Sequence, residues 1–203
     1  MRKSKKETNR TRMELLSAAQ KVFSSKGYSS ATLEEIAAEA GVTRGAIYHH
    51  FKNGKPAVLN ALCEDRYGRL SNSYAILESD VGARTKLESI INAYFEALES
   101  DPEFADLQYI LVYKTELSDE LMGGMEQKIS STRMLIDLYT NLIQSLLKST
   151  KMPPSLTANQ LATVIVSFQS GLTNLWLVDR TAVDLKHESS LMVKALLDSL
   201  IDE

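Results

Sequence analysis

A short run of residues near the N-terminus carries side chains that could bind a nucleic acid. Residues 41–51 read Gly-Val-Thr-Arg-Gly-Ala-Ile-Tyr-His-His-Phe. Thr43 can cap a helix that begins at Arg44, and the missing side chain at Gly45 would let the backbone approach a duplex closely. Arginine and tyrosine side chains can hydrogen-bond to phosphate oxygens, and arginine also reads guanine. The run therefore predicts a short helix whose outward face contacts DNA.

Another short helix has to precede this one and hold it in place. Thr32 and Glu35 have the spacing of a capping box, in which each side chain satisfies a backbone N–H at the start of a helix. Apolar residues recur at helical spacing across residues 33–40, and Gly41 can take the positive φ that commonly ends a helix. Two short helices joined by a Gly-containing turn form a helix-turn-helix, whose second helix enters the major groove. Such pairs also occur in helical bundles that bind no DNA, so the pattern alone leaves both interpretations open.

Charge is distributed unevenly along the chain. Residues 1–55 contain eleven Lys or Arg and five Glu, a net charge of +6, so the remaining residues carry −9 to reach the whole-chain charge of −3. The basic segment coincides with the predicted helix-turn-helix, and basic surface attracts the phosphate backbone. The basic residues at positions 2–6 alone would be typical of a solubilising tail. Beside a recognition helix, we expect them to form a flexible arm that touches phosphates or the minor groove.

Residues 21–51 carry a specific order of motifs, with Val22-Phe23, Gly27-Tyr28, Thr32 through Ala37 and Gly41 through Phe51. In this order they resemble the N-terminal DNA-binding domain of TetR family regulators. The resemblance implies a homodimeric, all-helical, ligand-responsive repressor that binds a palindromic operator. Family members often have a Lys at the position of Gly54, and we expect Lys52 or Lys55 to take its place. The candidate DNA-contact residues are Thr32, Thr43, Arg44, Gly45, Ala46, Tyr48, His49, His50, Lys52 and Lys55.

The rest of the chain is predicted to be helical as well, which gives an all-α fold. Only four prolines interrupt the 203 residues, and no clear strand alternation is present. We expect about nine helices: residues 8–26, the helix-turn-helix pair, 53–70, a helix around 87–98, 102–116, 118–147 with a weak start at Gly123-Gly124, 155–178 and 187–201. The predicted domains are a DNA-binding domain over residues 1–54 and a ligand-binding and dimerisation domain over residues 55–203.

The last two predicted helices each show one apolar face. Two neighbouring amphipathic helices can pair with their copies across a two-fold axis as a four-helix bundle, and the family resemblance also assigns dimerisation to them. Packing into the chain's own core explains the periodicity equally well. The candidate dimerisation residues are Leu161, Ile165, Phe168, Leu172 and Leu175 in the first helix and Leu191, Ala195, Leu196 and Leu200 in the second.

Shorter family matches continue beyond the predicted DNA-binding domain, at residues 113–117, 169–177 and 183–185. They look like the ligand-binding domain of multidrug-efflux repressors of the AcrR and TtgR type. Gln108, Ser170 and Asn174 also lie within apolar helices, where buried polar groups need partners. Hydrogen bonds between helices would meet that need as well as a ligand would. The candidate residues for contact with a small hydrophobic effector are Leu62, Arg66, Tyr94, Gln108, Val112, Ser170 and Asn174.

Several other classes of protein receive little support. The basic N-terminus lacks the apolar run of a signal peptide, and no segment approaches the length of a membrane span, so we expect a cytoplasmic protein without a membrane partner. No Gly-rich phosphate loop, paired catalytic carboxylates or nucleophile motif suggests an enzyme, and we expect no cofactor. His49 and His50 are adjacent, which does not suit metal ligation on one helix face. Cys63 is predicted to be a small packing residue, with a redox sensor as the alternative.

The sequence therefore predicts a ligand-gated transcriptional repressor. A ligand in the body would displace the helix at residues 53–70 and alter the separation of the two heads, so that ligand and DNA binding oppose each other. Control of a multidrug efflux pump is one expected role. Regulation of a metabolic operon by a specific metabolite, or DNA binding without a ligand, are the alternatives.

Overall fold

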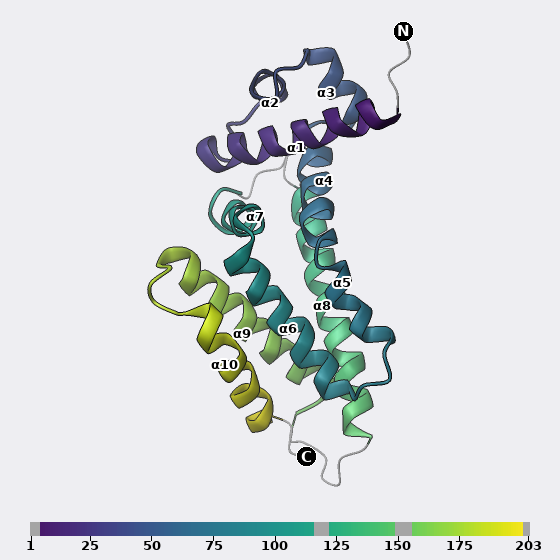
Figure 1. Cartoon of the computed structure of the whole chain (residues 1–203), viewed down its shortest axis with the longest axis vertical. Coiled ribbons are helices and arrows are strands. Elements are labelled where there is room, and N and C mark those ends of the chain that lie inside the picture. Colours follow the sequence, from purple (N-terminus) through teal and green to yellow (C-terminus); the bar gives the residue numbers. More distant parts are fainter. Residues whose placement is uncertain (1–4, 116–121, 149–155, 201–203) are drawn as a thin grey trace. The chain divides into compact units, whose positions relative to one another are not determined.

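The computed structural model of the chain describes residues 5–115, 122–148 and 156–200, and these are helical without a strand (Figure 1). The elements are α1 Lys5–Lys26, α2 Leu33–Glu39, α3 Arg44–His50, α4 Gly54–Gly68, α5 Ser71–Tyr74, the 3₁₀ turn η1 Ala75–Glu78, α6 Ala83–Ser100, α7 Pro102–Tyr113, α8 Met122–Leu147, α9 Ala158–Val178 and α10 Leu185–Leu200. Apart from the single turns α5 and η1, the described residues form nine helices, which confirms the predicted all-α class.

Most predicted helix ends lie within a few residues of the observed ones. The polar stretch after α4 holds only α5 and η1, as the predicted fading of that helix suggested. Gly123 and Gly124 lie in the first turn of α8, where a helix tolerates glycine better than in its middle. The predicted helix starts at Ser118 and Ser155 lie outside the described residues.

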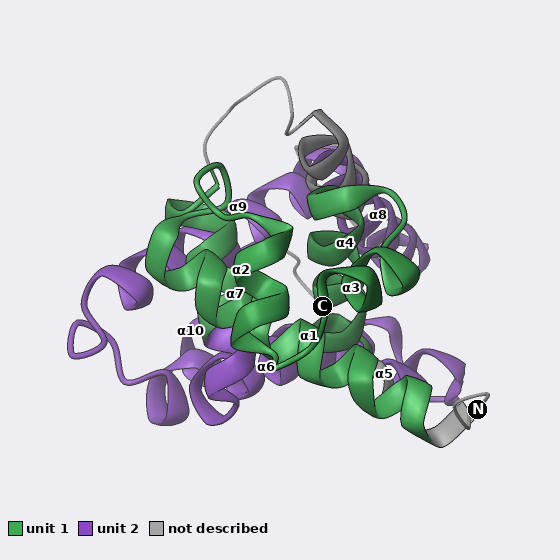
Figure 2. Cartoon of the chain, turned by 90° about the horizontal axis from the view of Figure 1, so that it is seen from above, with its two compact units in different colours: residues 1–68, 106–127 green, residues 69–105, 128–203 purple. Residues whose placement is uncertain are grey.

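The chain divides into two compact units (Figure 2). Unit 1 contains residues 1–68 and 106–127, and unit 2 contains residues 69–105 and 128–203. The predicted DNA-binding domain at residues 1–54 falls in unit 1, together with α4 and the C-terminal part of α7.

One apolar cluster forms the core of unit 1. It includes Leu15, Leu16, Phe23, Ile36, Ile47, Val58, Leu59, Leu62, Leu107 and Ile110. Ile47 is fully buried and is the inward anchor of α3, and burial of such a side chain contributes about 1.5–3 kcal/mol. The cluster therefore fixes the rotation of α3 about its axis and decides which of its residues face outward.

Unit 2 is built around α6, α8, α9 and α10. Its buried apolar side chains include Leu87, Ile91, Phe95, Leu98, Ile143, Leu161, Ile165, Leu172, Val193 and Leu197. A capping box starts α9, because the Thr157 side chain accepts from Gln160 N and the Gln160 side chain accepts from the Thr157 backbone. Contrary to the expectation from the sequence, α9 is long and apolar enough for a membrane span, and 44% of that window is buried inside the protein.

Candidate functional site

The turn between α2 and α3 has the geometry of a helix-turn-helix. Thr32 Oγ1 accepts from Glu35 N at 3.2 Å and Glu35 Oε2 accepts from Thr32 N at 3.1 Å, so the predicted capping box is confirmed. Gly41 has φ of +66°, which a side chain would strain, and Val42 N donates to Ala37 O at 2.9 Å. The turn is therefore held by α2's own carbonyl groups.

Thr43 occupies the N-cap position of α3, with extended backbone. Its side chain makes no capping hydrogen bond, so the predicted side-chain cap is wrong, and Ala46 N donates to the Thr43 backbone carbonyl at 2.9 Å. A Cβ added at Gly45 would meet only Thr43 Oγ1, at 4.0 Å, so the fold itself does not require glycine there. Close approach by an external molecule remains a reason for it.

The outward face of α3 carries most of the predicted contact residues. Arg44, Gly45, Tyr48 and His49 are exposed, as is Lys52 just beyond the helix. Ala46 and His50 are half-buried on the flanks of the buried Ile47. The structure thus places Arg44, Tyr48, His49 and Lys52 on one exposed strip, and their contact with DNA stays a prediction.

Several basic side chains of the head are paired with its carboxylates. Exposed ion pairs join Arg10 to Glu14, Lys21 to Glu39, Lys26 to Glu35 and Arg44 to Glu34. Such exposed pairs add little stability, but each one neutralises a positive charge locally. The net charge of +6 therefore depends mainly on the N-terminal residues 2–6 and on the basic side chains outside these pairs.

Lys55 is held by the fold. Its Nζ donates to the carbonyl oxygens of Tyr28 at 3.2 Å and Ser29 at 2.9 Å and lies 5.1 Å from the centre of the Tyr28 ring. These contacts fix the start of α4 to the turn after α1. They favour Lys52 over Lys55 as the residue that reaches a phosphate.

A contact that sequence reasoning missed joins the end of α7 to the turn after α1. Tyr28 N donates to Lys114 O at 2.8 Å, and Gly27, with φ of +81°, brings the two segments close enough for a built Cβ to lie 3.5 Å from that oxygen. No local sequence pattern predicts a bond between residues so far apart. The C-terminal part of α7 is therefore part of the support of the DNA-binding head.

Four of the candidate effector-contact residues belong to unit 1. Leu62 is fully buried in the core, and Val112 is 40% exposed. Arg66 is 2% exposed and donates from Nε to Gln20 Oε1 at 3.0 Å. The Gln108 amide exchanges hydrogen bonds with the Tyr67 hydroxyl at 3.2 and 3.1 Å. The polar side chains of Arg66 and Gln108 therefore have partners within unit 1.

A chain of buried polar groups crosses unit 2. The hydroxyls of Tyr94 and Thr173 lie 3.2 Å apart, Thr173 donates to Gln169 O at 2.7 Å, and Tyr139 donates to Gln169 Oε1 at 3.0 Å. Burial raises the pKa of Tyr94 to about 12 and raises the pKa of Tyr139 above its usual range, so both are neutral donors at physiological pH.

Ser170 and Asn174, by contrast, are exposed in the single chain, so their predicted burial is wrong. Each follows a polar residue that is buried, Gln169 or Thr173. One residue along a helix turns a side chain by about 100°, which separates the two faces. The ligand contact predicted for Ser170 and Asn174 stays a prediction.

The candidate dimerisation residues divide between core and surface. Leu161, Ile165 and Leu172 are buried in unit 2, so for these three the alternative of an internal core holds. Leu175 and Leu191 are 57% and 67% exposed. Ala195 is also exposed, and Phe168, Leu196 and Leu200 are half-buried.

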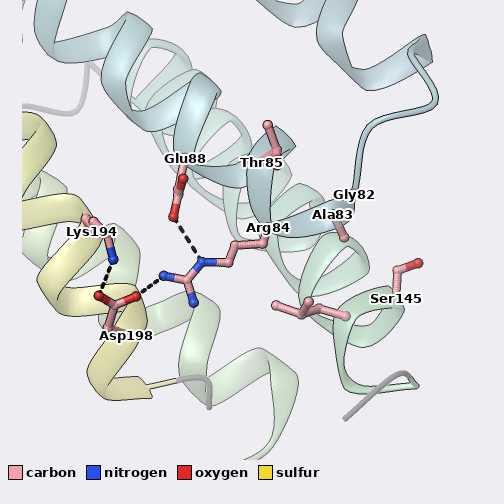
Figure 3. Close-up of a pocket in the computed structure, with 9 residues that line it drawn as sticks. Gly82, Ala83, Arg84, Thr85, Glu88, Ser145, Lys194 and Asp198 are labelled. Atoms are coloured by element: carbon pink, nitrogen blue, oxygen red, sulfur yellow. Dashed lines mark hydrogen bonds and ion pairs between the residues drawn. The ribbon is translucent and has the colours of Figure 1, made fainter. Parts of the chain in front are cut away.

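A polar cavity of about 540 Å³ lies in unit 2 among α6, α8 and α10 (Figure 3). Arg84 pairs with Glu88 at 3.0 Å and with Asp198, which also accepts from Lys194 at 2.6 Å. None of the candidate effector-contact residues lines this cavity. Its paired charges do not suit an apolar ligand.

Two further predictions concern reactive groups. Burial raises the pKa of the Cys63 thiol to about 12, which leaves almost no thiolate at neutral pH and favours the packing role. Within the described parts of the chain, no three His, Cys, Asp or Glu side chains are grouped so that they could hold a metal ion.

Comparison with known proteins covers both parts of the chain. Residues 15–62 match the family described as bacterial regulatory proteins, tetR family, and residues 84–201 match the C-terminal region of MAATS-type transcriptional repressors.

Individual relatives match along nearly the whole chain. The HTH-type transcriptional regulator TtgR of Pseudomonas putida is 30% identical over 98% of this chain and 96% of its own length. The HTH-type transcriptional regulator AcrR of Shigella flexneri is 32% identical over 97% of this chain and 92% of its own length. The crystal structure of native NalD, the secondary repressor of the MexAB-OprM multidrug efflux pump in Pseudomonas aeruginosa, is 27% identical, with a TM-score of 0.81 over 97% of this chain and 99% of that one.

Proposed function

This chain belongs to the tetR family of bacterial regulatory proteins, and on that premise we propose that it is a repressor which binds a palindromic operator as a homodimer and leaves it when a small hydrophobic ligand binds. The observation that carries this proposal is the α2–α3 geometry, in which the buried Ile47 turns Arg44, Tyr48 and His49 outward. The N-terminal turn of such a helix reads base edges, while basic side chains around it bind phosphates.

Dimerisation is proposed through the exposed faces of α9 and α10. Val164, Leu175 and Val178 are 37%, 57% and 71% exposed on α9, and Leu191 is 67% exposed on α10. Their spacing places the three α9 residues on one strip, with Gly171 between them. An apolar strip of this kind is suited to a self-complementary contact across a two-fold axis.

The effector is proposed to be a mostly apolar molecule with a few polar groups. The buried hydrogen-bond network that links Tyr94, Thr173, Gln169 and Tyr139 supplies hydroxyl and amide groups inside an apolar unit. Such groups would orient a ligand that enters the body. The earlier candidates Leu62, Arg66, Gln108, Val112, Ser170 and Asn174 are retained as proposed contacts.

The regulated gene is proposed to encode a multidrug efflux pump, since NalD represses one. The chain is proposed to work in the cytoplasm, without catalytic activity of its own. Two alternatives keep the same DNA-binding head. In one, a specific metabolite releases the operator of a metabolic operon, and in the other no ligand is involved.

Binding of the purified protein to the DNA upstream of its own gene tests these proposals. Salt would be titrated first, and hydrophobic drugs, dyes, flavonoids and fatty acids would then be added. Site-specific binding that one compound class abolishes supports the ligand-gated repressor. If neither the compounds of the panel nor cell metabolites abolish specific binding, the result supports the ligand-independent alternative. Loss of binding with a metabolite alone supports the metabolic one.

A further inference from the structure

Glu34, in the first turn of α2, contacts two side chains that α3 presents outward. Its Oε1 lies 2.8 Å from Arg44 Nε and accepts a hydrogen bond from the Tyr48 hydroxyl at 3.4 Å. The Arg44 guanidinium carbon lies 5.5 Å from the centre of the Tyr48 ring. Arg44 and Tyr48 are four residues apart and share one helix face. A single carboxylate oxygen thus connects two candidate base-contact residues.

A carboxylate at this position weakens the attraction of the surface for DNA. The Glu34 side chain is 46% exposed beside a side chain that would meet the duplex, so its charge repels phosphates. The Tyr48 hydroxyl oxygen, as an acceptor for Arg44, and the charge of Glu34 both raise the pKa of Arg44. For binding to an unrelated DNA sequence, the contribution of Glu34 is only unfavourable.

At a matching sequence the same contact has a different effect. A guanidinium has five N–H donors, one on Nε and four on its terminal nitrogens. Glu34 takes the Nε donor, and the Arg44 side chain is 70% exposed, so terminal donors stay accessible to a second acceptor. Two parallel donors match O6 and N7 of guanine in the major groove. A guanidinium that is already oriented loses less freedom when it binds there.

We propose that Glu34 is a specificity-determining positioning residue of the recognition helix. It holds Arg44 and Tyr48 in the orientation that suits base contact, and it penalises the capture of Arg44 by phosphates. This inference rests on the proposed DNA-binding role of α3. Glu34 performs both roles without touching DNA.

The same helix offers a matched control in Glu39. Glu39 pairs with Lys21 of α1 at 3.0 Å, and its side chain is 41% exposed, close to the value for Glu34. Glu39→Gln therefore removes one negative charge from α2 but leaves α3 untouched. Glu34→Gln removes the same charge and with it the ion pair to Arg44.

The experiment compares two 30-bp duplexes, one that the wild-type protein selects from a random pool and one that it does not select. Dissociation constants are measured for the wild type, Glu34→Gln, Glu39→Gln, Arg44→Ala and Glu34→Gln with Arg44→Ala, at several salt concentrations. Thermal unfolding establishes that each variant is folded. The random-pool selection is then repeated with Glu34→Gln.

For Glu34→Gln we expect tighter binding to the unselected duplex and a ratio of selected to unselected affinity that falls about fivefold or more. The sequences that Glu34→Gln selects from the random pool should show no base preference at one position of each half-site. Glu39→Gln should change both affinities equally, and Glu34→Gln should leave the ratio unchanged when Arg44 is already Ala. Equal effects of Glu34→Gln and Glu39→Gln on the ratio would overturn the inference. If the wild type selects no sequence at all, the proposed function itself fails.

Discussion

Lys52 and Lys55 lie three residues apart next to the recognition helix, yet their surroundings differ. Lys52 is exposed, whereas Lys55 Nζ donates to the carbonyls of Tyr28 and Ser29. We expect Lys52→Ala to weaken operator binding and to reduce the slope of log affinity against log salt by about one. Lys55→Ala should leave that slope unchanged and lower the free energy of unfolding by about 1.5–3 kcal/mol, the usual range for a hydrogen bond from a charged group. A smaller slope in Lys55→Ala with unchanged stability would assign the phosphate contact to Lys55.

The Cys63 thiol should make the protein less stable at alkaline pH. Its pKa is raised from 9.0 to about 12 in the folded chain. Above pH 9 the unfolded chain releases the thiol proton while the folded chain keeps it, so stability falls as pH rises from 9 towards 12. The slope approaches about 1.4 kcal/mol per pH unit. Urea unfolding of the wild type between pH 7 and 10 should show this decline.

Two variants separate the contribution of Cys63 from that of Tyr94. Cys63→Ala should lack the decline between pH 9 and 10. Above pH 10 the raised pKa values of Tyr94, Tyr139 and Tyr74 add a further decline, so unfolding measured up to pH 11 should show a smaller decline in Tyr94→Phe than in the wild type. Equal pH profiles for the wild type and Cys63→Ala would contradict the raised thiol pKa.

At the scale of elements, the capping box of α2 serves a helix of only seven residues. Such a short helix depends on its cap, so we expect Thr32→Ala to lower the free energy of unfolding by about 1 kcal/mol. Aspartate also caps helices, and Thr32→Asp should keep the wild-type stability. If Thr32 lies near a phosphate, as predicted, the added negative charge should weaken operator binding about tenfold at low salt. Thermal unfolding and a DNA titration measure the two effects separately.

The capping box of α9 provides the control for that prediction. Thr157 and Gln160 repeat the geometry of Thr32 and Glu35 in the other unit. Thr157→Ala should cost similar stability, and Thr157→Asp should leave both stability and DNA affinity near the wild-type values. Equal DNA affinity of Thr32→Asp and the wild type would remove Thr32 from the interface.

Local signals explain why α2 and α3 could be predicted from the sequence. The Thr32–Glu35 box, the positive φ of Gly41 and the inward position of Ile47 each depend on residues a few positions apart. The side-chain cap expected from Thr43 failed because a backbone carbonyl serves instead. Signals of short range thus predicted the candidate DNA-contact strip but not every bond within it.

The body could be predicted only as helices, because its faces depend on contacts between distant segments. Apolar residues occur on more than one side of α9, so periodicity alone did not show that Gln169 and Thr173 would face inward and Ser170 and Asn174 outward. The pairing of Tyr67 with Gln108 joins residues 41 positions apart. This pair depends on how α4 packs against α7, which no local sequence pattern specifies.

At the scale of the whole molecule, the proposed binding of a palindromic operator requires two DNA-binding heads. The centres of two half-sites lie about 34–36 Å apart on one face of the duplex, and one recognition helix covers only one of them. Joining two chains makes the second contact effectively intramolecular, which commonly increases affinity a hundredfold or more. A change that separates the chains should therefore weaken operator binding even when each head is intact.

Leu191→Glu is expected to make this separation. Leu191 is 67% exposed on α10, and a carboxylate there would be buried without a partner in the proposed two-fold contact. Size-exclusion chromatography with light scattering should show the wild type at twice the chain mass of 22.6 kDa and the variant at the chain mass itself. Operator affinity should fall at least a hundredfold, with little change in the circular dichroism spectrum.

Met134→Glu is the matched control, because Met134 is also 67% exposed but lies on α8. It should stay dimeric and keep its operator affinity, since an exposed carboxylate on a solvated helix face costs little. A wild-type protein that runs at the single-chain mass would refute the dimer directly. A dimeric Leu191→Glu together with a monomeric Met134→Glu would show that the two chains meet through α8 and not through α10. The separation of the two DNA-binding heads would then depend on α8, and the exposed leucines of α9 and α10 would not form the contact.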